Sequence, residues 1–264
     1  MEVYAGPAFS FVQDNYGRRW DFEYIASKYQ VIVANFDGRG SGYRGNKIMW
    51  KNYLNLGHYE PEDQIEFARK ISTEKDFIDE SRIMIWGRSY GGYTTSRIMA
   101  KDGLAYSNEN EGPSNPPETP GQAPVFKCGA IVAPVTDWKY YSTIYSERYL
   151  RTPTENPPGY EKSPTIQNYA IENYKNHDSI YIVHGTADDN VHFINSASLS
   201  KFMIQNGVEL AGNYFQSDEN HGFSLQPGLI GYYRHYTLME RLVNECLSPE
   251  LVEFGDDNEK LNLN

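Results

Sequence analysis

Short apolar runs alternate with helical patterns along this chain, and this alternation determines the fold class that we predict. Each run is three to five residues long, and the runs lie at 31–35, 83–86, 130–133, 180–183 and 213–215. Between the first two runs, residues 61–71 place Ile65 and Ala68 one helical turn apart. Strands that are separated by helices form parallel sheets, because the helices pack back onto the sheet faces. We therefore predict an α/β fold with a mostly parallel sheet flanked by helices.

The predicted domain spans residues 1–250. A chain of 264 residues is long enough to form one such domain with a large core. Residues 102–124 are rich in Pro, Asn, Ser and Gly and show no periodicity, so we interpret them as an exposed insertion. Residues 251–264 form a polar C-terminal tail that we expect to fray.

Charge and cysteine content exclude several classes of function. The net charge is −11, which argues against nucleic-acid binding and against an anionic membrane surface. No apolar run approaches the length of a membrane span, and residues 1–20 contain no signal-peptide core. Cys128 and Cys246 are too far apart for a CxxC site, and we expect no metal and no cofactor. Spacing alone favours two buried thiols over a long-range disulfide.

A single serine lies between glycines where the run 83–86 ends. Gly87, Ser89 and Gly91 fit the pattern G-x-S-x-G, and a helical pattern follows from Thr94. In this motif a sharp strand-to-helix turn lifts the serine hydroxyl above the sheet, and glycines prevent collisions there. The alternative is an ordinary glycine-rich turn. The strand before the motif and the helix after it favour a nucleophilic serine.

A nucleophilic serine needs a histidine base and a carboxylate that orients the base. In α/β hydrolases the acid and then the histidine follow the serine along the chain, each after a later strand. Asp188 and Asp189 follow the run 180–183, and His221 follows the run 213–215. Spacing does not separate the two aspartates. We interpret His58 and His177 as solvated and His184 as a support for the turn after its strand. His192 lies too close in sequence to the candidate acid to be its partner on a separate loop, and His235 belongs to the last helix.

Several segments together give the chain a family resemblance. They include VYAGP, FDGRGSGYRGNKIM, WGRSYGGY, VAPVTDWKYYSTIYSERY, HGTADDNVHF and DENHGF. With these segments the chain resembles, nearly end to end, the C-terminal hydrolase domain of the dipeptidyl peptidase IV family in the prolyl oligopeptidase group. The resemblance implies an α/β-hydrolase that cleaves peptides after proline or alanine near their amino terminus.

The resemblance also assigns the catalytic residues. It implies Ser89 as the nucleophile, Asp188 rather than Asp189 as the acid, and His221 as the base. It places the hydroxyl of Tyr4 and the backbone N–H of Tyr90 at the oxyanion. Without the resemblance, Tyr4 would be read as ordinary sheet packing.

Further expectations follow from the same resemblance. An apolar box for a proline ring would be formed by Tyr90, Val135, Trp138, Tyr141, Tyr145 and Val191. Asn190 would donate a hydrogen bond to the carbonyl of the residue before proline. Cys128 and Cys246 would form a disulfide, which implies the secretory pathway, the cell surface or an extracellular location. The C-terminal helix would form a homodimer contact.

The sequence departs from the family pattern in places. Arg88 stands where relatives usually have tryptophan, and the β-propeller and the first sheet strands of the family are not found in this sequence. We therefore interpret the chain as a fragment of a longer protein. One alternative function is a non-catalytic binding module, which the retained Ser89, Asp188 and His221 disfavour. The other is a broader acyl-peptide hydrolase or esterase, which the tyrosine-rich box disfavours.

Overall fold

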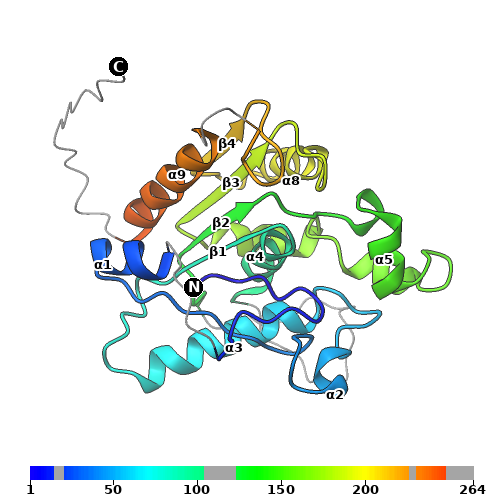
Figure 1. Ribbon diagram of the computed structural model, residues 1–264, viewed down its shortest axis with the longest axis horizontal. Helices are drawn as coiled ribbons and strands as arrows, with labels where there is room; N and C mark the ends of the chain where they lie inside the picture. Colours follow the sequence, from blue (N-terminus) through cyan, green and yellow to red (C-terminus); the bar gives the residue numbers. More distant parts are fainter. Residues whose placement is uncertain (15–20, 104–122, 226–229, 248–264) are drawn as a thin grey trace.

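A computed structural model describes residues 1–14, 21–103, 123–225 and 230–247. Its centre is a sheet of four parallel strands in the order β1-β2-β3-β4 (Figure 1). The strands are β1 (Met84–Arg88), β2 (Cys128–Val132), β3 (Ser179–Gly185) and β4 (Gly212–Gln216). Each strand overlaps one of the predicted apolar runs, and the predicted parallel α/β architecture is confirmed. The predicted insertion lies almost wholly outside the described residues, and the predicted tail lies entirely outside them.

The predicted strand at 31–35 is wrong. This segment neighbours the N-terminal residues, where the Glu2 N–H donates to the Ala34 carbonyl at 3.1 Å. Glu2 also forms a single parallel bridge with Trp86 of β1. The N-terminal residues therefore separate 31–35 from β1 and offer it too few backbone partners for a ladder. Ile32 remains 60% exposed, so the segment also lacks the burial of a central strand.

Helices cover both faces of the sheet because its side chains alternate between two cores. One face packs on α3 (Tyr59–Glu74), α4 (Tyr90–Lys101), α7 (Ile171–Lys175) and α8 (Ile194–Gln205). The opposite face packs on α9 (Ile230–Leu247) (Figure 1). Ile85, Ile131 and Ile182 face the first core, whereas their neighbours Met84, Ala130 and Val183 face the second. This period of two confirms that apolar residues fill both faces of the strands.

The remaining elements are short. The helical ones are η1 (Asp21–Ile25), α1 (Ala26–Tyr29), α2 (Asn46–Met49), η2 (Trp138–Tyr140), α5 (Thr143–Leu150), α6 (Pro157–Lys162) and η3 (Asn168–Ala170). Within the described part of the chain, no helix combines the length and apolar character needed to cross a membrane.

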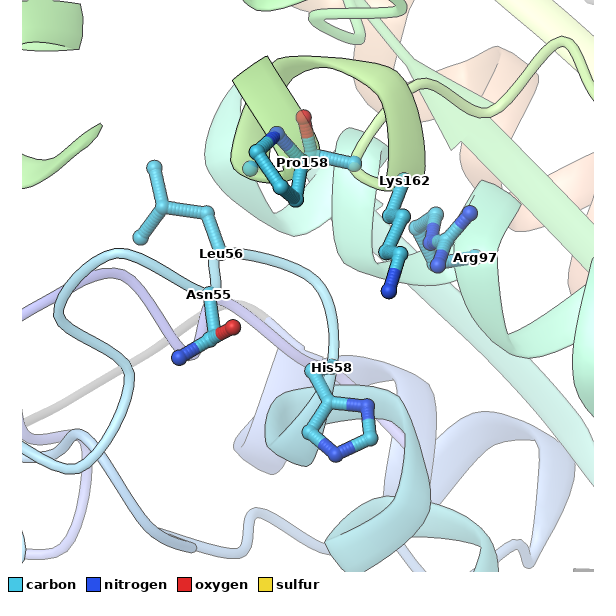
Figure 2. Close-up of a pocket in the computed structure, with 8 residues that line it drawn as sticks. Asn55, Leu56, His58, Arg97, Pro158 and Lys162 are labelled. Atoms are coloured by element: carbon cyan, nitrogen blue, oxygen red, sulfur yellow. The ribbon is translucent and has the colours of Figure 1, made fainter. Parts of the chain in front are cut away.

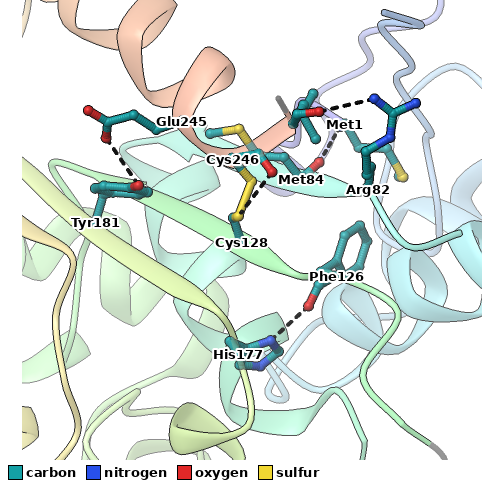
Figure 3. The surroundings of a disulfide bond; sticks show 10 residues. Met1, Arg82, Met84, Phe126, Cys128, His177, Tyr181, Glu245 and Cys246 are labelled. Atoms are coloured by element: carbon teal, nitrogen blue, oxygen red, sulfur yellow. Dashed lines mark hydrogen bonds between the residues drawn. A yellow bond between two sulfur atoms is a disulfide. The ribbon is translucent and has the colours of Figure 1, made fainter. Parts of the chain in front are cut away.

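A disulfide bond fastens the last helix to the sheet. Cys128 of β2 is bonded to Cys246 of α9, with 6.0 Å between their Cα atoms (Figure 3). Two further contacts hold the same end of α9: Tyr181 donates to Glu245 at 3.2 Å, and Arg82 donates to the Leu247 carbonyl at 3.2 Å. The disulfide that the family resemblance implies is confirmed, and the reading from spacing as two thiols is wrong.

Candidate active site

Ser89 occupies a tight turn between β1 and α4. Its backbone has φ 62° and ψ −119°, a left-handed conformation that costs a serine about 1–3 kcal/mol. The turn is held by the Ser89 N–H, which donates to the Val132 carbonyl at 2.9 Å. A Cβ atom at Gly87 would lie 2.4 Å from the Val3 carbonyl oxygen, and one at Gly91 would lie 2.1 Å from it. Only glycine fits at positions 87 and 91, as the motif predicts.

Asp188 and His221 form a hydrogen-bonded pair at the same edge of the sheet as Ser89. Asp188 follows β3 and His221 follows β4, so both lie at the carboxyl ends of their strands. The His221 Nδ1–H donates to Asp188 Oδ2 at 2.7 Å. The side chain of Asp188 is fully buried, whereas Asp189 is exposed. Asp188 is therefore the aspartate that bonds His221, a choice that spacing leaves open.

The loop that carries His221 is fastened to the loop that carries Asp188. The Ala187 N–H donates to the Glu219 carbonyl at 3.0 Å. Gly185, at the end of β3, permits this approach, because a Cβ atom there would lie 2.2 Å from the same oxygen. The Asn220 side chain accepts from the Gly222 N–H at 3.0 Å and so fixes the turn around the histidine. These contacts fix the position of His221 relative to Asp188.

Burial alone would raise the pKa of Asp188, but its hydrogen bonds have the larger combined effect. His184 and His221 donate to Oδ2, and the N–H groups of Asn190 and Val191 donate to Oδ1 at 2.9 and 2.8 Å. Together these donors hold the pKa of Asp188 well below its usual range. Asp188 is thus an anion with four hydrogen bonds, suited to stabilise a positive charge on His221.

His184 is a site residue that sequence reasoning missed, because it was read as structural. The fully buried ring places Nε2 3.1 Å from Asp188 Oδ2 and 2.8 Å from the Val191 carbonyl oxygen. Both partners only accept hydrogen bonds, so Nε2 carries the proton. Nδ1 then accepts from the hydroxyl of Ser196 at 2.7 Å. The spacing of four residues between His184 and Asp188 was the signal available in the sequence.

The Ser89 hydroxyl and His221 form no hydrogen bond with each other, although both residues are described. Because Nδ1 of His221 donates to Asp188, Nε2 is the ring nitrogen left to accept the serine proton. Such bonds are often loose before substrate binds and tighten in the reacting complex.

Tyr4 and Tyr90 lie beside the serine turn, with their ring centroids 6.0 Å apart. Tyr4 directly follows Val3, whose N–H donates to the Trp86 carbonyl at 2.9 Å next to the end of β1. Burial is the main cause that raises the pKa of Tyr4, so its hydroxyl remains a proton donor at neutral pH. Tyr90 is the first residue of α4, where backbone N–H groups have no acceptor within the helix.

The residues predicted for the proline box lie together in one cluster. The Trp138 ring is stacked on Tyr145 at 5.8 Å and lies 5.4 Å from Tyr90. Val135 and Val191 are buried in the same cluster, and Tyr141 packs against it. Tyr141 donates its hydroxyl hydrogen to Asn190 Oδ1 at 2.8 Å. This bond assigns the acceptor end of the Asn190 amide and leaves its NH₂ group to donate elsewhere.

A buried carboxylate behind the box was also missed from the sequence. Glu60 lies at the start of α3 and accepts from the Tyr90 hydroxyl at 2.6 Å. It also accepts from the Gly57 N–H at 3.1 Å. Burial raises the pKa of Glu60 in spite of these hydrogen bonds. The position of Glu60 in an acid-rich stretch gave no sign of burial, because such stretches are usually solvated.

No group of three or more His, Cys, Asp or Glu side chains able to hold a metal ion occurs among the described residues. The side chains gathered at this edge of the sheet are those of the serine, the two histidines, the aspartate and the tyrosines.

A serine at a strand-to-helix turn, with an acid and a histidine after later strands of one parallel sheet, defines the α/β-hydrolase class. The profile of the prolyl oligopeptidase family matches residues 17–107 and 119–241. The chain belongs to this family, and the resemblance found in the sequence is confirmed.

Individual relatives agree with this family. Dipeptidyl peptidase 4 of Felis catus is 40% identical over 250 residues, which cover 94% of this chain and 29% of the relative. Prolyl endopeptidase FAP of Homo sapiens is 38% identical over 250 residues, with the same coverage. The crystal structure of Porphyromonas gingivalis dipeptidyl peptidase 4 matches with a TM-score of 0.75 at 31% identity, over 93% of this chain and 31% of that chain. The chain thus spans about three-tenths of the length of the curated relatives it matches.

Proposed function

We propose that this chain is the hydrolase domain of a serine dipeptidyl peptidase that cleaves peptides after proline or alanine near the amino terminus. The observation that carries the proposal is the hydrogen bond between the buried Asp188 and the partly buried His221, at the same sheet edge as the strained turn of Ser89. The names of the relatives, dipeptidyl peptidase 4 and prolyl endopeptidase FAP, support this class of substrate.

In the proposed mechanism Ser89 attacks the carbonyl carbon of the scissile peptide bond. Nε2 of His221 takes the proton from the serine hydroxyl and then delivers it to the leaving amine. The peptide bond breaks, and the serine carries the dipeptide as an ester. A water molecule, activated by His221 in the same way, hydrolyses this ester. The carboxylate of Asp188 orients the imidazole and stabilises its cation in both halves of the reaction.

Negative charge on the former carbonyl oxygen needs donors that are already in place. The Tyr4 hydroxyl and the Tyr90 N–H would supply them, because both lie beside the Ser89 turn. Removing one such donor typically lowers kcat by about 10²–10³-fold.

His184 acts through Asp188 and is proposed as a positioning residue. It donates to the same oxygen, Oδ2, that accepts from His221, and Ser196 fixes its tautomer. A charged acceptor bound by two side chains cannot rotate away when His221 becomes a cation. This contact keeps the acid in the orientation that the base needs.

The aromatic cluster supports the preference for proline. A prolyl ring has no N–H group, so aromatic walls of Tyr90, Trp138 and Tyr145 would bury it without leaving a donor of the substrate unpaired. The free NH₂ group of Asn190 would donate to the carbonyl of the preceding residue. A broader esterase would not require such a box, which disfavours that alternative.

Labelling with a fluorophosphonate probe tests the proposed nucleophile, with Ser89→Ala as the blank. We expect the native chain to be labelled and to hydrolyse a Gly-Pro anilide faster than a Gly-Leu anilide. An unlabelled serine would favour the binding-module alternative. Labelling without a preference for proline would favour the broader hydrolase.

Location and assembly are also proposals. The disulfide between Cys128 and Cys246 supports an oxidising compartment, such as the secretory pathway or the cell surface. A homodimer through α9 is supported by Ile230 and Tyr233, which are 45% and 71% exposed at its start. Sedimentation of the native chain and of Tyr233→Glu tests the dimer, since the variant should sediment as a monomer.

A further inference from the structure

The proposed mechanism gives no role to Arg88, although this residue directly precedes Ser89. Arg88 ends β1 and stands where the family pattern has tryptophan. Its side chain is partly exposed, and within the described ranges no hydrogen bond or ion pair engages its guanidinium. A guanidinium is a permanent cation with five N–H donors. This cation therefore remains available to an acceptor that a ligand brings.

Arg97 of α4 shows, by contrast, how a structural arginine is held in this protein. Figure 2 shows Arg97 and Lys162 in the wall of a small pocket between α4 and α6. Arg97 is fully buried, and its guanidinium donates to the carbonyls of Gly57 and Pro164 at 3.2 and 2.8 Å. The donors of Arg97 thus serve the fold, whereas those of Arg88 have no such acceptors among the described residues.

The register of the sheet determines the face onto which Arg88 projects. Arg88 is paired with Val132 of β2, and paired residues of neighbouring strands point to the same face. Val132 belongs to the core that packs under α9. Arg88 therefore projects on the α9 side of the sheet. The proline box lies on the opposite side, where α4 begins with Tyr90.

Two neighbouring groups locate the charge of Arg88. Burial is the main cause that raises the pKa of Tyr4, and the charge of Arg88 opposes this rise. Burial, followed by the charge of Arg88, lowers the pKa of His235 of α9 to about 3. The His235 ring is stacked on Phe223, with 4.3 Å between the ring centroids, and Phe223 follows His221 by two residues. Arg88 thus lies on the side of the site that carries the loop of His221.

The proposed reaction divides the substrate between these two sides. The residue before the scissile bond would be held in the proline box, and the leaving amine would take its proton from His221. The chain beyond the scissile bond would therefore run away from the box and toward the α9 side of the sheet, where Arg88 projects.

We infer that Arg88 binds a carboxylate of the substrate on the leaving-group side of the scissile bond. The planar guanidinium matches a carboxylate with two parallel hydrogen bonds, which a tryptophan at this position could not form. The carboxylate belongs either to an acidic side chain shortly after the scissile bond or to the carboxyl terminus of a short peptide. This inference rests on the proposed peptidase activity, and it makes Arg88 a residue that determines specificity.

Matched peptides measure the preference. The amides of Gly-Pro-Glu-Ala and Gly-Pro-Ala-Glu are each compared with the peptide in which Gln replaces Glu, and Gly-Pro-Ala-Ala is compared as free acid and as amide. In at least one pair the carboxylate should raise kcat/KM by about 5-fold at low ionic strength, and added salt should reduce this ratio. A preference confined to the free acid would identify the carboxyl terminus as the source of the carboxylate.

Variants then assign the preference to Arg88. Arg88→Gln should bring the ratio to about one, whereas Arg88→Lys keeps a cation and should retain part of it. The matched control is Arg82→Gln, which removes the same charge before the start of β1, roughly 20 Å away along the strand. Arg82→Gln should keep the ratio. Because the readout is a ratio, a general loss of activity in a variant does not affect it.

Binding to Ser89→Ala separates this inference from the proposed activity. This variant lacks the nucleophile, so calorimetry can measure the affinity of the same peptides without cleavage. No cleavage by the native chain, with tighter binding of the carboxylate peptides that Arg88→Gln removes, would refute the activity and support the role of Arg88. Equal ratios in the native chain and Arg88→Gln, or loss of the preference in Arg82→Gln as well, would overturn the inference. A native chain without any preference would overturn it too.

Discussion

Reducing the disulfide between Cys128 and Cys246 should destabilise the protein while leaving α9 in place. The two residues are 118 positions apart in the sequence. Closing a loop of this length removes about 16 cal/mol/K from the entropy of the unfolded chain, or about 5 kcal/mol at 25 °C. Met239 and Leu242 still bury α9 against the sheet after reduction. The predicted loss therefore arises mainly because the unfolded chain gains freedom.

Urea unfolding, followed by tryptophan fluorescence with and without a reductant, measures this loss. With a denaturant slope of about 3 kcal/mol/M, the midpoint should fall by roughly 1.5 M on reduction. The double variant Cys128→Ala/Cys246→Ala is the control, because its midpoint should be low and insensitive to reductant. Equal midpoints for the oxidised and the fully reduced native chain, with thiols counted in both, would refute the reasoning.

Four further predictions concern the candidate active site. Tyr4→Phe should lower kcat for a Gly-Pro anilide by about 10²-fold with little change in KM; an unchanged kcat would remove Tyr4 from the oxyanion. His184→Gln should lower kcat/KM by about 10-fold and move the acid limb of the pH profile of kcat/KM to higher pH, because Asp188 loses a charge-assisted donor that competes with His221 for Oδ2. An acid limb that does not move would make the role of His184 merely structural. Glu60→Leu should raise KM, because the Tyr90 hydroxyl loses its acceptor. Glu60→Gln keeps an acceptor oxygen and should raise KM less. Equal rises in KM for the two variants would contradict a role for Glu60 in fixing Tyr90. The fold lowers the pKa of Asp188, so the Asp188 carboxylate stabilises the folded protein above a pH of about 4, and this contribution is lost as the pH falls below that value. The difference in unfolding free energy between the native chain and Asp188→Asn should therefore shrink from pH 6 to pH 3.

The sequence predicts those parts of the fold that depend on local pattern. The four strands of the sheet carry their own apolar runs, and the strand-turn-helix context identifies the turn of Ser89. The prediction of a strand at 31–35 failed because a strand needs a partner as well as a pattern, and Glu2 gives this segment one backbone hydrogen bond, at the Ala34 carbonyl, while its parallel bridge goes to Trp86. Local pattern carries no information about that partner.

The site residues that were missed depend on contacts between distant segments. His184 and Asp188 are close in sequence, but only the fold brings Ser196 and His221 to their two sides. Glu60 looks like a solvated helix residue until Tyr90 is packed over it. Neither spacing nor composition separated Asp188 from Asp189, because the choice depends on which side chain the end of β3 turns inward. The disulfide was implied by family resemblance alone.

The position of His221 after the last strand has a consequence for biosynthesis. Ser89 leaves the ribosome well before His221, and β4 must add to the edge of β3 before the histidine can meet Asp188. The proposed nucleophile therefore stays without its proposed base until β4 and the loop that carries His221 have been made. Cys246 emerges later still, so oxidation can secure α9 only after the histidine is available. In a nascent chain built in this order, the proposed nucleophile and the proposed base meet only after β4 has joined the sheet.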